Sequence, residues 1–311
     1  MNRRLAIATL SYETDKRGLV PHHCDLYIWC SNAHRLAMHI RGGADVMVLS
    51  NMPHHVSREC GDVQQPQVND RLVDLARAFT RTRPALAKSV GHGRFAMITL
   101  LKWQLMHPSI GYRLVMFLDL DIDVFYRKWT LLQFQTLNHK LDAFERNGRL
   151  KLAAAPDHSS PINSGVMLFK PSRRLYSEGI ELLRTMEFNT THGFNHSGPP
   201  AGAIPPHLHT NSRAFRLNTW DFVGANTDQG LFTHIFLVKH GEMYTKTTQS
   251  AAVPVVRHFW GGDKPLVMHT CKKYFRERNA TRVTPCAMHI RVLERSISAR
   301  ARCKGVDWPL L

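Results

Sequence analysis

Short apolar runs alternate with segments of helical period in the first half of the chain, and this alternation restricts the fold more than any other feature. The runs with strand character are residues 5–12, 44–50 and 113–118. Helices are expected at residues 24–40, 69–79, 95–105 and 130–146. Strands that alternate with helices form mainly parallel sheets covered by helices. We therefore predict an α/β fold whose ligands bind at the carboxyl ends of the strands.

The composition is that of an ordinary folded protein with an excess of positive charge. Of the 311 residues, 43% are apolar and 21% are charged, which excludes disordered, collagen-like and coiled-coil chains. The length suits one large domain or two small ones. Lys and Arg number 41 against 24 Asp and Glu, so the formal net charge is +17. Such a charge favours anionic partners, although a role in solubility alone is equally open.

Neither a membrane span nor a disulfide scaffold is expected from the sequence. No run reaches the roughly 18 to 20 apolar residues that a span needs, and the start shows no signal or anchor. A cytoplasmic location is therefore favoured, with the Golgi lumen as the alternative if an upstream anchor is missing. The six cysteines form no CxxC pair and are too sparse for a disulfide scaffold. Sequons begin at Asn189, Asn195 and Asn279, and such triplets arise often by chance.

The most informative segment is VMFLDLDIDVF, residues 115–125, in which an apolar strand ends in alternating acids. Asp119 and Asp121, two positions apart, lie on the same side of an extended chain. Carboxylates at the end of a buried strand are costly unless they are paired or bind a metal. Oxygen ligands of this kind suit Mg2+ or Mn2+, and a metal beside basic residues indicates a diphosphate. The alternative is a polar transition from strand to turn that caps the next helix.

Two classes of enzyme place a DxD motif after an apolar strand. Phosphatases of the haloacid dehalogenase type carry it near the chain start and need a later GDxxxD-like metal motif. Here the motif lies deep in the chain, and no second acid follows Gly262 and Asp263. Nucleotide-sugar transferases use DxD for the metal that holds the donor's diphosphate. The position of the motif favours this second class.

Three later motifs agree with the second class. Residues 163–165, Asn-Ser-Gly, lie between two expected strands, where polar groups suit a hydroxylated ligand and glycine allows a close backbone approach. Residues 228–230, Asp-Gln-Gly, open an apolar helix, and helix capping is the simpler explanation of their polarity. Residues 258–265, HFWGGDKP, combine a common metal ligand with a glycine-rich turn and a lysine suited to phosphate.

In this order, the four motifs resemble those of the glycogenin-like retaining glycosyltransferases of family 8, over roughly residues 4–266. The resemblance implies a single Rossmann-like nucleotide-sugar transferase domain of the GT-A type with a mixed, mainly parallel sheet, a Mn2+ (or Mg2+) ion and a UDP-sugar donor. It implies that Asp119, Asp121 and His258 bind the metal. It further implies that the donor is held by Leu10, Ser11, Leu120, Asn163, Ser164, Gly261 and Lys264, with Asp228 and Gln229 at the reacting carbon.

Several departures from the pattern of that family bear on activity. Relatives carry a lysine at the position of Thr99, four residues before Trp103, whereas this chain places Lys102 one helical turn further on. We expect Lys102 to supply the missing charge. Ala225 stands where a second aspartate is usual. Tyr244 is the single tyrosine between Gln229 and His258, so self-glucosylation is not supported.

The sequence therefore predicts a metal-dependent retaining glycosyltransferase that moves a hexose from a UDP-sugar to a carbohydrate or protein acceptor. The catalytic domain is expected over residues 1–285, with a Pro-rich insert loop at 187–220 and a C-terminal helix and basic tail at 286–311. Nucleic acid is an unlikely partner for such an enzyme. The alternative is a non-catalytic protein of the same fold that binds an anionic polymer or nucleic acid.

Overall fold

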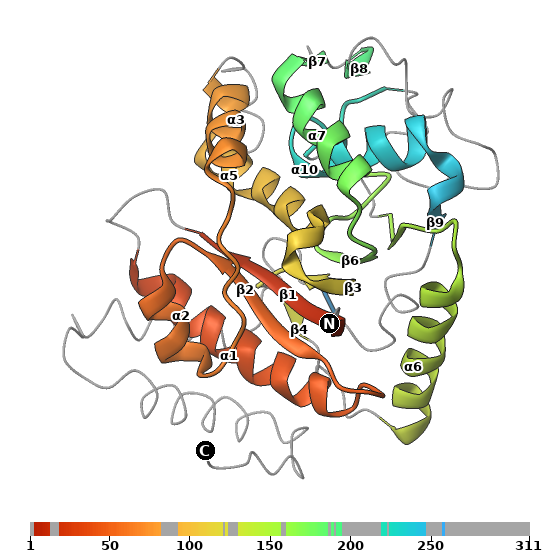
Figure 1. Ribbon diagram of the computed structural model, residues 1–311. Helices are drawn as coiled ribbons and strands as arrows, with labels where there is room; N and C mark the ends of the chain where they lie inside the picture. The colour runs from red at the N-terminus through yellow and green to blue at the C-terminus, as the bar shows by residue number, and fades with distance from the viewer. Residues whose placement is uncertain are drawn as a thin grey trace.

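A six-stranded sheet forms the centre of the described part of the protein (Figure 1). The computed structural model describes residues 3–12, 19–81, 93–120, 122–123, 130–156, 160–185, 188–189, 191–194, 219–222, 224–246 and 257–258. The strand order is β2-β1-β3-β6-β5-β9. These strands are β1 (Arg3–Ser11), β2 (Asp45–Ser50), β3 (Tyr112–Leu118), β5 (Leu152–Ala154), β6 (Val166–Phe169) and β9 (Tyr244–Lys246). Since β6 pairs antiparallel with β3 and β5 while the other pairs are parallel, the predicted mixed, mainly parallel sheet is confirmed.

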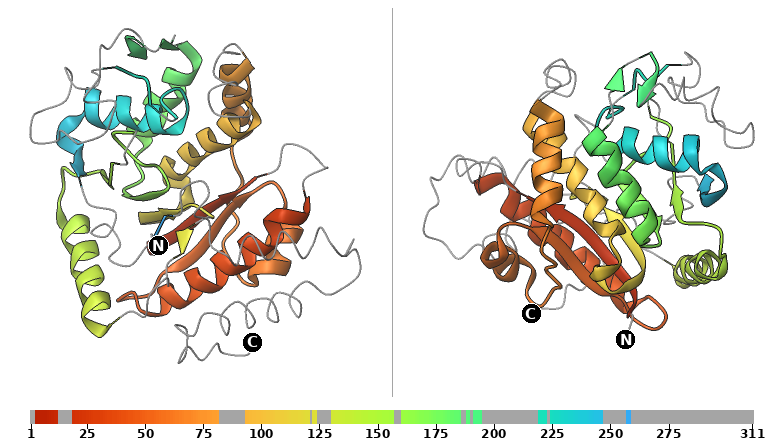
Figure 2. Two further views of the ribbon diagram at one scale, coloured as in Figure 1. Left: turned by 180° about the vertical axis from the view of Figure 1, so that it is seen from behind. Right: turned by 45° about the horizontal axis from the view of Figure 1, so that its top comes forward.

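Helices cover both faces of the sheet, as the two views of Figure 2 show. One face packs against α1 (Leu19–Met38), α2 (Pro53–Cys60) and α6 (Leu131–Arg146). The other packs against α3 (Asp70–Arg81), α5 (Gly93–Leu100), the 3-10 helix η1 (Leu101–Met106), α7 (Arg173–Thr185) and α10 (Asp228–Thr233). Side chains of β3 alternate between the two faces of the sheet. Met116 and Leu118 pack in the core on the α1 face, and Val115 and Phe117 pack in the core on the opposite face.

Shorter elements complete the described structure. β4 (Ile122–Asp123) pairs antiparallel with β10 (Arg257–His258), and β7 (Phe188–Asn189) pairs antiparallel with β8 (Gly193–Phe194). Two further 3-10 helices span Pro108–Ile110 and Gly241–Met243, and α10 continues as a π-helical segment over His234–Lys239. Most of the predicted insert loop and the whole C-terminal helix and tail lie outside the described residues. Among the described helices, none is both long and apolar enough to cross a membrane.

The helix expected at residues 95–105 is only partly correct. α5 ends at Leu100, and the chain continues as the tighter helix η1. All six side chains of η1 are buried, including those of Lys102 and Gln104. The prediction assumed an amphipathic α-helix, which leaves one face exposed. Because η1 is enclosed on all sides, tertiary packing and not the 3.6-residue period determines its conformation.

A disulfide joins Cys30 on α1 to Cys60 at the end of α2, with 5.3 Å between their Cα atoms. Both residues belong to the core beneath the α1 face of the sheet. The pairing was not predicted, because two cysteines 30 residues apart form no recognisable motif. Closing a loop of this size restricts the unfolded chain and so stabilises the folded state by about 3 to 4 kcal/mol.

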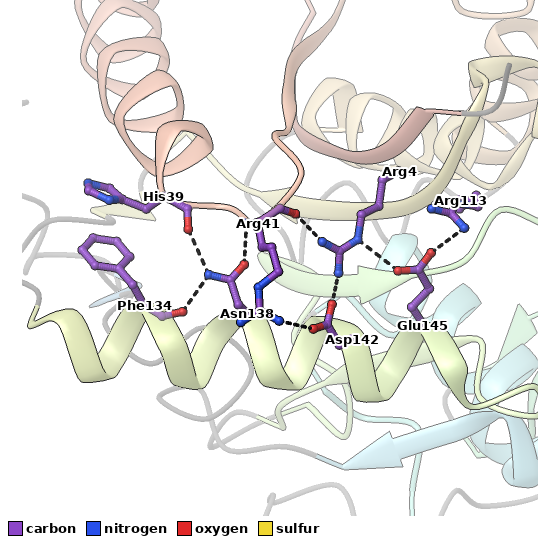
Figure 3. Close-up of polar contacts among 8 residues, drawn as sticks. All are labelled: Arg4, His39, Arg41, Arg113, Phe134, Asn138, Asp142 and Glu145. Atoms are coloured by element: carbon purple, nitrogen blue, oxygen red, sulfur yellow. Dashed lines mark hydrogen bonds and ion pairs between the residues drawn. The ribbon is translucent and has the colours of Figure 1, made fainter.

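Helix α6 is fixed to the edge of the sheet by polar contacts (Figure 3). Arg4 of β1 donates to Asp142 and, over 3.0 Å, to Glu145. The Asn138 side chain accepts from the backbone N–H of Arg41 over 2.7 Å and donates to the carbonyl of residue 39 over 2.9 Å. These contacts pair backbone groups of residues 39 and 41, which follow the end of α1. They also orient α6 against the sheet. They lie at the edge of the sheet where β3 begins, since Arg113 at the start of β3 also pairs with Glu145.

Candidate active site

A buried lysine lies between two carboxylates at the carboxyl edge of the sheet. The Nζ of Lys102, on η1, is 3.0 Å from Oδ1 of Asp119 and 3.0 Å from Oδ2 of Asp228. It also donates to the carbonyl and the hydroxyl of Ser164, each over 3.3 Å. The side chains of Lys102 and Asp228 are 4% and 5% exposed. Lys102, which we expected to supply the charge missing at Thr99, thus contacts the acid that follows β3.

The surrounding charges set the pKa values of Lys102 and Asp228. Burial opposes the charged form of Lys102, but the charges of Asp119 and Asp228 and their hydrogen bonds raise its pKa above the ordinary value. Burial would likewise raise the pKa of Asp228, yet the Lys102 charge and three hydrogen bonds hold that pKa below its ordinary value. Both groups are therefore charged at neutral pH, although they are removed from water.

Asp228 is the first residue of α10, but it is not the helix cap. The N-cap position belongs to Thr227, whose side chain makes no capping hydrogen bond. The Asp228 carboxylate instead accepts the hydroxyl of Ser164 over 2.5 Å and that of Thr227 over 3.2 Å. Capping, the simpler explanation in the sequence, is therefore not the role of this carboxylate. The contribution of Thr227 was missed, because a threonine before the Asp-Gln-Gly motif carries no signal of its own.

Glycine at the third position of this motif is required by close packing. The backbone N–H of Gly230 donates to the carbonyl of Gly224 over 2.8 Å. A Cβ atom at Gly230 would lie 1.4 Å from the carbonyl oxygen of Ala225. The tight turn over residues 224–227 thus packs against the first turn of α10 and sets the position of Asp228. Gln229 lies beside it and is half-buried.

Asp119 follows β3 directly and is the more exposed of the two acids, at 29% of its side-chain surface. Its backbone N–H donates to the carbonyl of Gly165 over 2.9 Å, and its carbonyl accepts from Ile122 over 3.0 Å. Leu120 is half-buried and packs against the core on the α1 face. The carboxylate of Asp119 is therefore held by Lys102 on one side and keeps partial access to solvent.

The end of β1 lies at the same edge of the sheet. β1 and β3 are parallel and adjacent, with Ala8 opposite Phe117, and the same offset aligns Leu10 with Asp119. Leu10 and Ser11 are both buried. The predicted nucleotide-side residues of β1 and the first predicted metal ligand thus share the carboxyl edge.

Asn163 shapes the turn that carries Ser164. Its side-chain oxygen accepts the backbone N–H of Gly165 over 2.7 Å. The backbone N–H of Asn163 donates to the carbonyl of Ala155, also over 2.7 Å. The residue is 3% exposed. Asn163 therefore fixes the loop between β5 and β6, and Ser164 delivers the hydroxyl that contacts Lys102 and Asp228.

The predicted metal ligands and the predicted phosphate-binding residues are described only in part. Asp121, Gly261 and Lys264 lie outside the described residues, and His258 is described only through its backbone. That backbone pairs with Ile122 in the β4–β10 ladder, so the described residue that begins HFWGGDKP lies beside the two residues that follow DxD. Within the described side chains, no three His, Cys, Asp or Glu residues converge on one point. Asp119 is thus the one predicted ligand whose side chain is placed.

Comparisons with known proteins leave the family open. No protein-family model matches the chain, and no curated protein matches it. Among solved structures, it is similar to mouse xyloside xylosyltransferase 1 in its apo form, with a TM-score of 0.40 and 13% identity over 79% of this chain and 85% of the other. Membership of the glycogenin-like family stays a prediction. The function proposed below therefore depends on the geometry of this chain's own residues.

Proposed function

We propose that this chain is a metal-dependent retaining glycosyltransferase that transfers a hexose from a UDP-sugar to a carbohydrate or protein acceptor. One observation carries the proposal. Lys102, Asp119, Ser164 and Asp228 come from four separate segments, and they meet at the carboxyl edge of the sheet. Three of them belong to the DxD, NSG and DQG motifs. In open α/β sheets this edge is the usual place for ligands.

The balance of charge in this cluster favours a divalent cation when the donor is bound. Two carboxylates and one ammonium leave a net negative charge at the site, which repels a diphosphate. A bound Mn2+ or Mg2+ would reverse this sign and neutralise charge on the departing UDP. Asp119 is the described residue that fits such an ion, because its carboxylate is partly exposed and offers hard oxygen atoms. Asp121 and His258 are proposed as the further ligands from the motifs alone.

The surroundings of Asp228 favour a positioning role over a nucleophilic one. Its carboxylate receives Lys102, Ser164 and Thr227 as donors, and donors of this kind stabilise the charge that a nucleophile would have to give up. Asp228 would then hold the Lys102 ammonium toward Asp119. Gln229, which is half-buried beside it, is the neighbour proposed to approach the donor sugar.

The decisive experiment measures release of UDP from a panel of UDP-sugars, with Mn2+ and with a chelator. We expect turnover of one or more donors that needs the metal, and a loss of at least about a hundredfold in Asp119→Asn, since several kcal/mol of charge stabilisation depend on the ion. Asp74→Asn is the matched control. Asp74 is 73% exposed and pairs with Arg77 within α3, so its replacement should leave the rate unchanged.

Other outcomes would reject the proposal. Equal turnover with the chelator, or near wild-type rates in Asp119→Asn, would remove the metal site from the mechanism. Absence of any UDP binding together with salt-sensitive binding of nucleic acid would favour the non-catalytic alternative, for which the net charge of +17 is the supporting observation.

A further inference from the structure

The turn between β7 and β8 carries one of the three sequons. Asn189 lies opposite Gly193 in this hairpin. Asn189 and Thr191, the two residues that define the sequon, are exposed, whereas Gly193 and Phe194 are buried. Position 190 is threonine and not proline, as the acceptor motif requires. In Figures 1 and 2 the hairpin lies at the rim of the molecule, beyond α7.

The inner side of the hairpin is anchored in an aromatic cluster. The Phe194 ring lies 5.0 Å from that of Phe188 and 5.9 Å from that of Trp220, between ring centroids. Gly193 adopts a φ of 70°, and a Cβ atom there would lie 2.1 Å from the Trp220 ring. This side is fixed against Trp220, whereas Asn189, Thr191 and His192 are exposed on the other side of the hairpin.

The orientation of the Asn189 side chain suits attachment through its nitrogen. Its oxygen accepts the backbone N–H groups of Thr191 over 3.0 Å and His192 over 2.6 Å. Backbone N–H groups only donate, so the atom that faces them is the amide oxygen and Nδ2 lies on the other side. A substituent on Nδ2 leaves that oxygen free to accept, and the turn keeps both hydrogen bonds.

A second, independent observation concerns the compartment in which the chain folds. Cys30 and Cys60 form a disulfide within the core. Structural disulfides form in the secretory lumen and are rare in the cytosol, and the same lumen is where asparagine in sequons receives glycans. An exposed sequon and a core disulfide therefore indicate the same compartment.

We propose that Asn189 is a site of N-linked glycosylation when the chain folds in the secretory lumen. The donor is an oligosaccharide linked to a polyisoprenyl diphosphate. The bond between its anomeric carbon and the diphosphate oxygen breaks, a bond from that carbon to Nδ2 forms, and one Nδ2 proton is lost to a base of the transferase. This inference is independent of the proposed glycosyltransferase activity.

The test expresses the full chain behind a cleavable signal peptide in eukaryotic cells and treats it with an amidase that removes N-glycans in 18O-labelled water. We expect the peptide with residue 189 to carry the label as aspartate. The gel shift on amidase treatment should lose one step in Asn189→Gln and in Thr191→Ala. It should be retained in Thr191→Ser, which preserves the sequon.

Two results would overturn the proposal. One is a peptide that is unlabelled at residue 189, whatever is found at Asn195 and Asn279. The other is a wild-type gel shift in Thr191→Ala, since a modification that ignores the sequon is not this reaction. Because Thr191 is exposed, its replacement also keeps the test valid if Asn189→Gln folds poorly.

Discussion

Replacement of Lys102 by methionine tests whether the buried cation holds the candidate site together. Methionine has nearly the length of the lysine stem and fills the same space in η1, so the change removes the charge with little loss of volume. Asp228 would remain 5% exposed with only the Ser164 and Thr227 hydroxyls as donors. We expect a large loss of stability, because a buried charge would be left without its partner.

The expected magnitude follows from the burial of both groups. Removal of one member of a buried ion pair costs about 3 to 5 kcal/mol. The free energy of unfolding of a whole domain is about 5 to 15 kcal/mol, so Lys102→Met should lose a substantial part of it. Removal of both partners is often nearly neutral. The double variant Lys102→Met/Asp228→Asn should therefore be more stable than the sum of the two single effects predicts.

Urea denaturation at pH 7, with the slope m compared between variants, measures these differences. Lys239→Met is the matched control. The Lys239 side chain is 50% exposed and its Nζ lies 3.3 Å from Glu178, and such surface pairs contribute about 0 to 1 kcal/mol. A Lys102→Met protein that stays within about 1 kcal/mol of wild type would refute the reasoning. So would double-variant effects that are simply additive.

Two further predictions concern the packing and ionisation of α10 and its continuation. Gly230→Ala should lower the free energy of unfolding by about 1 to 3 kcal/mol and lower donor turnover, because its Cβ would meet the Ala225 carbonyl. Gly148→Ala is the control, since no atom lies within 4 Å of the added Cβ. It should be neutral in the same melting and UDP-release assays. Burial lowers the pKa of His234 from 6.5 to about 4, so its contribution to stability is complete above pH 6.5 and is lost as the pH falls to about 4. At about 1.36 kcal/mol per pH unit, this amounts to roughly 3 kcal/mol. His234→Gln should flatten that part of the pH–stability curve, and an unchanged slope would contradict the assignment.

The sequence predicted those elements whose patterns are local. The helix expected at residues 69–79 is α3, because Leu72, Ala76 and Phe79 lie on one buried face. The helix expected at 130–146 is α6, where Thr130 and Gln133 form a capping box. The strands at 44–50 and 113–118 appear as β2 and β3 within one residue of their predicted ends.

Features that depend on distant segments were not available from local patterns. The disulfide between Cys30 and Cys60 needs α1 and α2 to lie side by side on one face of the sheet. The contact between Lys102 and Asp228 joins residues of η1 and α10. A lysine inside a helical segment ordinarily indicates a solvent-exposed face. Its burial is stable here only because two carboxylates approach it from elsewhere in the chain.

The reversal of one strand explains why the motifs meet. β6 runs antiparallel to β3, with Val166 opposite Leu118. The residues that precede β6 therefore lie at the same edge as the residues that follow β3, and Ser164 reaches the neighbourhood of Asp119. A parallel β6 would send the NSG turn to the opposite edge of the sheet. Lys170, which follows β6, does lie at that opposite edge, where it donates to the carbonyl of Glu145 near the end of α6.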